Sequence, residues 1–275
     1  KLYSFSSKYS DVVIKTIPFN GFAETRNECI QLSKDTNYRY TLFIDDSFKL
    51  SPKQNIRSEL NKVSNKSKFI SLNIVRNDRI RYNSLRIFRT DSNACYTGKI
   101  HEIIKRETDE YIQTELIDLE TELQLKRTKE RMFYDFNQLD GLNDARSLYY
   151  KAKLSMQLYK AGVVSKEQVI EAFNRRIEHN SSNKEETFLC HMILGTLYYN
   201  LENIKEAVRN YLMGALLFPG RCGEAYLWIY SITKNDRWLK KAYDNRYYKN
   251  CLLQVDTKIY SNDGEGMIQK CYEIK

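Results

Sequence analysis

Residues 41–46, Thr-Leu-Phe-Ile-Asp-Asp, place two carboxylates directly behind a short apolar run. A run of apolar and β-branched residues of this length predicts a buried strand, which ends at Asp45 and Asp46. A strand that ends in acidic residues sets them at the carboxyl edge of a sheet, where α/β proteins bind their ligands. We therefore expect residues 41–44 to form a central strand of an α/β sheet.

The sequence on either side of this strand predicts alternating elements. The β-branched run 12–17, ended by Pro18, predicts a strand, and residues 23–33 predict a helix with one packed side. Residues 51–54, Ser-Pro-Lys-Gln, predict a helix start, because a capping serine, a first-turn proline and a glutamine three residues after the cap stand together. That helix is expected to continue through Ile56, Leu60 and Val63.

A run of strands follows. Alternating apolar and polar residues over 69–75 predict a half-buried strand, and Asn77-Asp78 predicts a turn. Further strands are predicted over 82–88 and 99–104, with an edge strand over 112–119. Strands and helices that alternate before such a run indicate an α/β domain with an antiparallel flank.

After about Glu120 the apolar period changes to 3.6, which indicates helices. Residues 204–216 carry a continuous amphipathic stripe, and residues 165–168, Ser-Lys-Glu-Gln, form a capping box that opens another helix. Helices of about 13–18 residues are expected to follow one another to the end of the sequence. We predict two domains, an α/β domain over 1–120 and an all-α domain over 121–275.

One helical pair follows the tetratricopeptide pattern in order and spacing. Small residues stand where two helices cross, aromatic residues fill the groove between hairpins, and a proline stops the second helix: Leu194, Gly195, Tyr198, Ala207, Tyr211, Gly214 and Pro219. Neighbouring hairpins are predicted over 148–179 and 225–248, since one repeat cannot bury its own face. The alternative is a generic helical bundle. Such repeats bind a protein partner or a second copy of the chain.

Composition sets limits on the class of protein. The chain of 275 residues is 42% apolar and 29% charged, which indicates a globular protein. A net charge of +9 favours anionic partners, but the basic residues are dispersed, so we expect no nucleic-acid partner. No apolar run approaches the roughly 20 residues of a membrane span. The 6 cysteines form no C-x-x-C pair, which favours a reducing, cytoplasmic location.

Four motifs carry a resemblance to a known family. Residues 22–27, 42–46, 85–89 and 96–102 resemble, in order, the motifs of family-2 glycosyltransferases of the GT-A fold. The resemblance is closest to the branch in which tetratricopeptide repeats follow the catalytic domain, and it covers nearly the whole chain. It implies transfer of a sugar from a nucleotide-sugar donor to a hydroxyl of a glycan, lipid or protein, with inversion at the anomeric carbon.

The resemblance also implies roles for individual residues. Arg26 and Asn27 are expected to contact the phosphate or sugar of the donor. Asp45 matches the first Asp of the D-x-D motif, so it is expected to bind the donor and a divalent cation, Mn²⁺ or Mg²⁺. His101 is expected beside the metal and diphosphate, as a donor-binding and metal residue. Glu102 is the candidate general base.

Two departures from the family pattern bear on activity. The second Asp of D-x-D falls on Ser47, which is a poor ligand for Mg²⁺ or Mn²⁺. Either Asp46 takes over as a catalytic and metal-binding carboxylate through a local shift, or metal binding is weakened or lost. The strands that hold the nucleobase and ribose in the family have no counterpart before Val12, so we expect about the first third of the GT-A domain to be missing.

Three functions remain open at this point. The first is an active glycosyltransferase, favoured by the retained Arg26, Asp45, His101 and Glu102. The second is a catalytically impaired remnant that serves as an interaction or structural scaffold, favoured by Ser47 and the missing strands. Nucleic-acid binding rests only on charge and abundant tyrosine.

Overall fold

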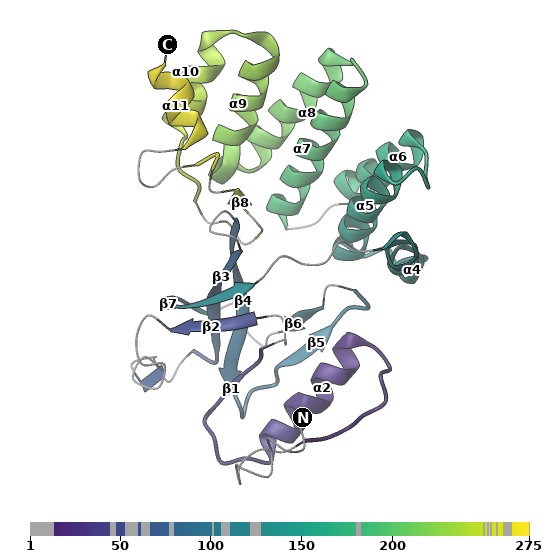
Figure 1. The fold of residues 1–275 in the computed structure, drawn as a ribbon, viewed down its shortest axis with the longest axis vertical. Coiled ribbons are helices and arrows are strands. Elements are labelled where there is room, and N and C mark those ends of the chain that lie inside the picture. Colours follow the sequence, from purple (N-terminus) through teal and green to yellow (C-terminus); the bar gives the residue numbers. More distant parts are fainter. Residues whose placement is uncertain are drawn as a thin grey trace.

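The computed structural model describes residues 14–44, 48–52, 60–61, 67–76, 80–100, 102–105, 111–121, 128–179, 183–249, 251, 253, 255–256, 258–260 and 266–274. The protein is a mixed α and β structure: a part made mostly of strands comes first, and a succession of helices follows (Figure 1). We call the described part up to Thr121 the sheet half and the part from Thr128 the helical half. The predicted domain boundary near residue 120 stays a prediction.

The sheet half contains helix α2 and seven strands among its described residues, and Leu60 and Asn61 are also helical, as predicted for Leu60. Its main sheet has the order β1-β4-β3-β7-β2, in which only the β3–β7 pair is parallel, and β5 and β6 form a separate hairpin. The elements are α2 (Phe22–Lys34), β1 (Tyr40–Leu42), β2 (Phe48–Pro52), β3 (Phe69–Arg76), β4 (Ile80–Arg89), β5 (Cys95–Thr97), β6 (Ile103–Lys105) and β7 (Ile112–Thr121).

Two apolar cores lie on opposite faces of this sheet. Phe69 and Phe88 are cross-strand partners that pack with α2 and the β5–β6 hairpin. Their chain neighbours Ile70 and Ile87 are also partners, and they pack on the other face with the side chains of β1. Because successive side chains of a strand point to opposite faces, α2 and the hairpin are fixed on one face of the sheet.

The strand predicted to be central, over 41–44, and the strand predicted to lie at an edge, over 112–119, have the opposite positions in the sheet. β1 pairs with β4 alone among the described strands, so the expectation that it is central is wrong. β7 lies between β3 and β2, so it is not the expected edge strand. An apolar run indicates burial of its side chains, and it says nothing about which neighbours its backbone bonds.

Three other expectations about local structure are wrong. Ser51 and Pro52 end strand β2, where they pair with Asp118 and Ile117, and so they do not begin a helix. Residues 14–17 form no strand, and the predicted strand over 99–104 is reduced to β6. Lys53, Gln54, Ile56 and Val63 and the predicted turn at Asn77-Asp78 lie outside the described residues.

The helical half follows the predicted order of hairpins. α5 packs on α6, α7 on α8 and α9 on α10, and these pairs succeed one another in the array (Figure 1). The capping box at Ser165 and Gln168 is present at the start of α6, as predicted. The helices are α4 (Lys129–Gln138), α5 (Ala145–Lys160), α6 (Lys166–Glu178), α7 (Lys184–Asn200), α8 (Ile204–Leu217), α9 (Cys222–Thr233), α10 (Asp236–Asp244) and α11 (Met267–Glu273), with a 3-10 turn η1 (Pro219–Arg221).

The crossing of α7 and α8 is built on small residues. Gly195 and Ala207 are both buried, as predicted, and the ring of Tyr211 lies directly over Gly195. The predicted stripe on α8 is only partly buried, because Ile204 and Leu216 at its two ends are exposed. Pro219 follows the last turn of α8, where a helix cannot continue.

Gly195→Ala is expected to destabilise the protein by about 1–3 kcal/mol, because the added methyl overpacks the crossing. A Cβ at Gly195 would lie 2.7 Å from Tyr211 Cε1, and the hydroxyl of that ring is held 3.0 Å from Thr196 Oγ1. In an open helix the same change stabilises by about 1 kcal/mol, so the sign of the effect is diagnostic. Urea unfolding of Gly195→Ala, alone and in a Tyr211→Leu background, measures it. Destabilisation that persists without the ring would contradict the proposed clash.

The expectation that the chain is all helical from about residue 128 is wrong at one place. The two-residue strand β8 (Val255–Asp256) pairs antiparallel with Ile80 and Arg81 of β4. It lies between the sheet and helices α9 and α11 (Figure 1). β8 uses the same edge of β4 as β1, at the opposite end of that strand.

The segment around β8 is also tied to the helices. The Leu253 N–H donates to Glu185 Oε2 at 3.0 Å, and the buried Tyr260 hydroxyl donates to the Arg221 carbonyl at 2.7 Å. The helical array is therefore bonded to the sheet through this segment. Within the described residues, no helix has the length and apolarity that crossing a membrane requires.

Candidate functional site

The first and last of the four motifs meet at an ion pair. Arg26 lies in the second turn of α2, and its Nη1 donates to Glu102 Oε1, directly before β6. The two residues are 76 positions apart in the sequence, so the fold brings them together. Their side chains are only 19% and 10% exposed, which strengthens the attraction relative to a pair in water.

Aromatic rings surround the Arg26 guanidinium. Its Cζ lies 5.7 Å from the ring centres of Phe22 and Phe43, and 5.3 Å from that of Tyr96. Rings at such distances attract a cation through their negative faces and exclude water from it. Sequence reasoning named Arg26 without these rings, although all three belong to the quoted motifs.

Asn27 connects α2 to the hairpin that carries Glu102. Its Nδ2 donates to the Tyr96 carbonyl at 2.9 Å, and its Oδ1 accepts from the Tyr96 N–H at 2.6 Å. Both ends of the amide are thereby bonded to the backbone of β5. The contact of Asn27 with the donor stays a prediction, and in the structure the residue fixes the hairpin beside Arg26.

Asn27→Asp is expected to lower the free energy of unfolding by about 1–3 kcal/mol, because a carboxylate oxygen would face the Tyr96 carbonyl without a proton to share. Chemical denaturation measures the loss. Asn174→Asp, at an exposed position of α6, is the matched control and is expected to change stability by less than about 0.5 kcal/mol. Equal effects of the two substitutions would argue against the bond pair at Tyr96.

Strand β1, which precedes the acidic motif in the sequence, is bonded to both β4 and α2. The Phe43 N–H donates to the Arg86 carbonyl at 2.8 Å, which extends the contact with β4 past the last residue of β1. Thr41 Oγ1 donates to Ser33 Oγ at 3.0 Å and so ties β1 to α2. The side chains of Phe43 and Tyr96 then lie together, with ring centres 5.3 Å apart.

The remaining predicted site residues lie outside the described residues. They are Asp45, Asp46 and His101, together with Ser47. Their assignment to donor and metal binding stays a prediction. Among the residues that the structure does describe, no group of three His, Cys, Asp or Glu side chains is arranged to hold a metal ion.

Helix α4 of the helical half approaches the same site. The guanidinium carbon of Arg131 in α4 lies 5.8 Å from the ring centre of Phe22. In α5, burial raises the pKa of the Tyr150 phenol, and the charges of Glu186 and Glu102 add to this effect while Arg146 opposes it.

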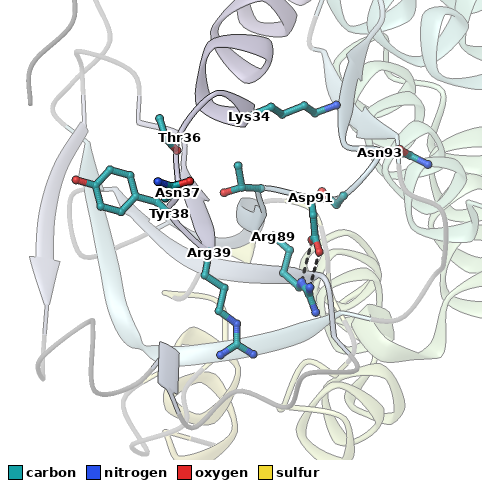
Figure 2. A pocket seen from close by; sticks show the side chains of 10 residues that line it. Lys34, Thr36, Asn37, Tyr38, Arg39, Arg89, Asp91 and Asn93 are labelled. Carbon is teal, nitrogen blue, oxygen red and sulfur yellow. Dashed lines mark hydrogen bonds and ion pairs between the residues drawn. The ribbon is translucent and has the colours of Figure 1, made fainter.

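A separate pocket of about 330 Å³ lies at the other end of β1. Arg39 and Arg89 extend to the same side of it, and Asp91 accepts from Arg89 Nε at 2.9 Å (Figure 2). The hydrogen bonds from Arg89 hold the pKa of Asp91 below its usual value. Arg39 precedes β1 whereas Phe43 follows it, so this pocket is distinct from the site of Arg26 and Glu102.

Comparison with known proteins leaves the site to be interpreted from its own chemistry. The chain matches no protein-family model, and it matches no curated protein.

Proposed function

We propose that this chain carries a GT-A-like glycosyltransferase domain followed by a tetratricopeptide-like array, and that it transfers a sugar from a nucleotide-sugar donor to a hydroxyl of an acceptor. The observation that supports this best is the convergence of Arg26 and Glu102, from motifs 76 residues apart, in a largely buried ion pair. The four-motif order of the sequence supports the same proposal.

The two side chains have complementary tasks in such a transfer. Arg26 offers a fixed cation in an aromatic surrounding, where it stabilises the negative charge of a departing diphosphate. Glu102 supplies a carboxylate that takes the proton of the acceptor hydroxyl. In the described state the two neutralise each other, so a diphosphate that draws Arg26 towards itself would release Glu102 to act as a base.

In the proposed transfer, one bond to the anomeric carbon forms as another breaks. The acceptor oxygen bonds to the anomeric carbon from the face opposite the leaving group, and its proton passes to Glu102. The bond from the anomeric carbon to the diphosphate oxygen breaks, and its electron pair leaves with the nucleoside diphosphate. A single displacement of this kind inverts the configuration at the anomeric carbon.

The proposed function includes a divalent cation, for which Asp45, Asp46 and His101 would be the ligands. When bound, it would neutralise the diphosphate. The proposed location is the cytoplasm, in keeping with the free thiols of all six cysteines.

A catalytically impaired scaffold is the second candidate. It is favoured by the engagement of Glu102 with Arg26, and by hairpin packing in the helical half that resembles tetratricopeptide repeats, with Tyr211 seated over Gly195. In that case the helical half would bind a protein partner or a second copy of the chain, and the sheet half would have lost turnover.

Calorimetric titration separates the two candidates. The full-length gene product is titrated with UDP-glucose, UDP-N-acetylglucosamine and GDP-mannose, each with and without Mn²⁺. The enzyme proposal predicts saturable binding of at least one donor, weakened by Arg26→Gln and by Asp45→Ala. If the full-length protein binds none of these donors under either condition, the enzyme proposal fails and the scaffold remains.

A further inference from the structure

A group of three solvent-exposed aromatic side chains and one arginine adjoins the Arg26–Glu102 pair. It consists of Phe19, which precedes α2, Phe22 at the start of α2, and Arg131 and Tyr134 on α4, and we call it the aromatic rim. The segment that leads into α2 runs towards α4, so the sheet half and the helical half both contribute (Figure 1).

The rim residues contact one another in a row. The rings of Phe19 and Phe22 meet edge to face with centres 5.0 Å apart. The guanidinium carbon of Arg131 lies 5.8 Å from the ring centre of Phe22 and 5.5 Å from that of Tyr134. Arg131 therefore links the rings of the two halves.

Arg131 is held by an ion pair with a residue of its own helix. Its Nε lies 3.0 Å from Oδ1 of Asp135, one turn later on α4, and Asp135 is buried. A guanidinium carries five N–H donors in a fixed plane, and the Arg131 side chain is 47% exposed, so donors remain accessible beside this ion pair. A side chain positioned in this way loses little freedom when it binds a ligand.

The rings of the rim are too exposed to serve as core. Phe19 is 63% exposed, Tyr134 56% and Phe22 41%, whereas the rings of the sheet core, such as Phe69, are fully buried. Exposed apolar groups gathered in one place mark interaction surfaces. The two most exposed rings stand at the two ends of the row.

The rim is continuous with the candidate site. Phe22 lies within 5.7 Å of the Arg26 guanidinium carbon as well as within 5.8 Å of that of Arg131. A ligand seated on the rim would therefore reach the neighbourhood of Glu102, which the transfer requires of the acceptor hydroxyl.

We propose that the aromatic rim binds the acceptor, and that the acceptor is a carbohydrate; this inference rests on the proposed transferase function. The C–H groups on the face of a sugar ring carry partial positive charge and fit the negative face of an aromatic ring. The accessible donors of Arg131 are suited to the hydroxyls at the edge of the sugar. The guanidinium groups of Arg26 and Arg131, on either side of Phe22, interrupt the apolar surface that a lipid tail would need. This argues for a sugar.

Two neighbouring residues of α4 provide a matched test. Tyr134 belongs to the rim, whereas Phe133 is 47% exposed and makes no ring contact with the rim among the described residues. Successive helical residues point about 100° apart, so the two side chains sample different surfaces of one helix. Circular dichroism first verifies folding of the wild type and of Phe19→Ala, Tyr134→Ala and Phe133→Ala. Each protein is then titrated with maltotriose, cellotriose and chitotriose, and saturation-transfer NMR measures binding.

The expected result is that at least one trisaccharide binds the wild type, and that Phe19→Ala and Tyr134→Ala each weaken it about three- to tenfold. Phe133→Ala should leave binding unchanged. If no trisaccharide binds, or if Phe133→Ala weakens binding as much as Tyr134→Ala, the rim is not an acceptor site.

Donor binding distinguishes this failure from failure of the transferase proposal. Titration of the same variants with UDP-glucose, UDP-N-acetylglucosamine and GDP-mannose should give the wild-type affinity for whichever donor binds, since the rim lies outside the residues assigned to the donor. Lost sugar binding with donor binding intact overturns only the rim. Trisaccharide binding to the rim without binding of any donor leaves a carbohydrate-binding surface and overturns the transferase.

Discussion

Glu102→Gln is expected to lower the rate of sugar transfer by about 10²–10⁴-fold, because an amide of the same shape cannot accept the acceptor proton. Donor affinity is expected to stay equal or to rise, since the amide weakens the ion pair that competes with the diphosphate for Arg26. Initial rates over a range of donor and acceptor concentrations measure both quantities. The loss should therefore fall on kcat, without a rise in the KM of the donor.

Two measurements keep this result interpretable. Glu28→Gln changes an exposed carboxylate on α2, which lies 3.7 Å from Lys15 Nζ, and is expected to leave the rate unchanged. Thermal unfolding of Glu102→Gln shows how much the weakened bond from Arg26 contributes to stability. If the Glu102→Gln variant keeps most of its turnover, Glu102 has no catalytic role.

Arg176→Ala is expected to destabilise the protein by about 3–5 kcal/mol, because it leaves a buried carboxylate without its main partner. Arg176 is fully buried, and its Nη2 donates to Glu186 Oε2 at 2.9 Å. Its Nη1 also donates to Thr187 Oγ1 at 3.2 Å. Arg146, at 3.4 Å from Glu186 Oε1, is too exposed to replace it. The free energy of unfolding in guanidinium chloride measures the effect.

Neighbouring substitutions separate this pair from a general loss of packing. Arg175→Ala removes an exposed arginine of the same helix, whose Nη2 donates to Asn143 Oδ1 at 3.2 Å, and should cost less than about 1 kcal/mol. Arg176→Met with Glu186→Leu should recover much of the stability, since both charges are then gone. A loss below about 1 kcal/mol for Arg176→Ala would mean that water reaches Glu186.

Elements with a strong local signal could be predicted from the sequence. The helix over 23–33, the strand over 69–75 and the capping box at Ser165 are present, because periodicity and capping depend on residues close in the chain. Ser51-Pro52 also carries a local signal, and there pairing with β7 prevails over it. A two-residue strand such as β8 has no signal of its own.

The candidate site could be predicted only in part. The meeting of Arg26 with Glu102 followed from the resemblance, which orders the motifs without fixing their contacts. The bonds of Asn27 to the backbone of Tyr96 could not be foreseen, because an amide beside a functional arginine is equally suited to a ligand. The part played by Arg131 depends on where α4 lies relative to α2, which no local pattern specifies.

The pairing of β8 with β4 has a consequence for the order in which the protein is made. Val255 reaches the ribosomal exit about 170 residues after Arg81, its partner in the sheet. At a synthesis rate of about 5–20 residues per second, β8 is made about 9–35 s after this part of β4. Ile80 and Arg81 are thus open to other strands during translation, and they are closed by a segment that arrives after the hairpins from α5 to α10 have been made.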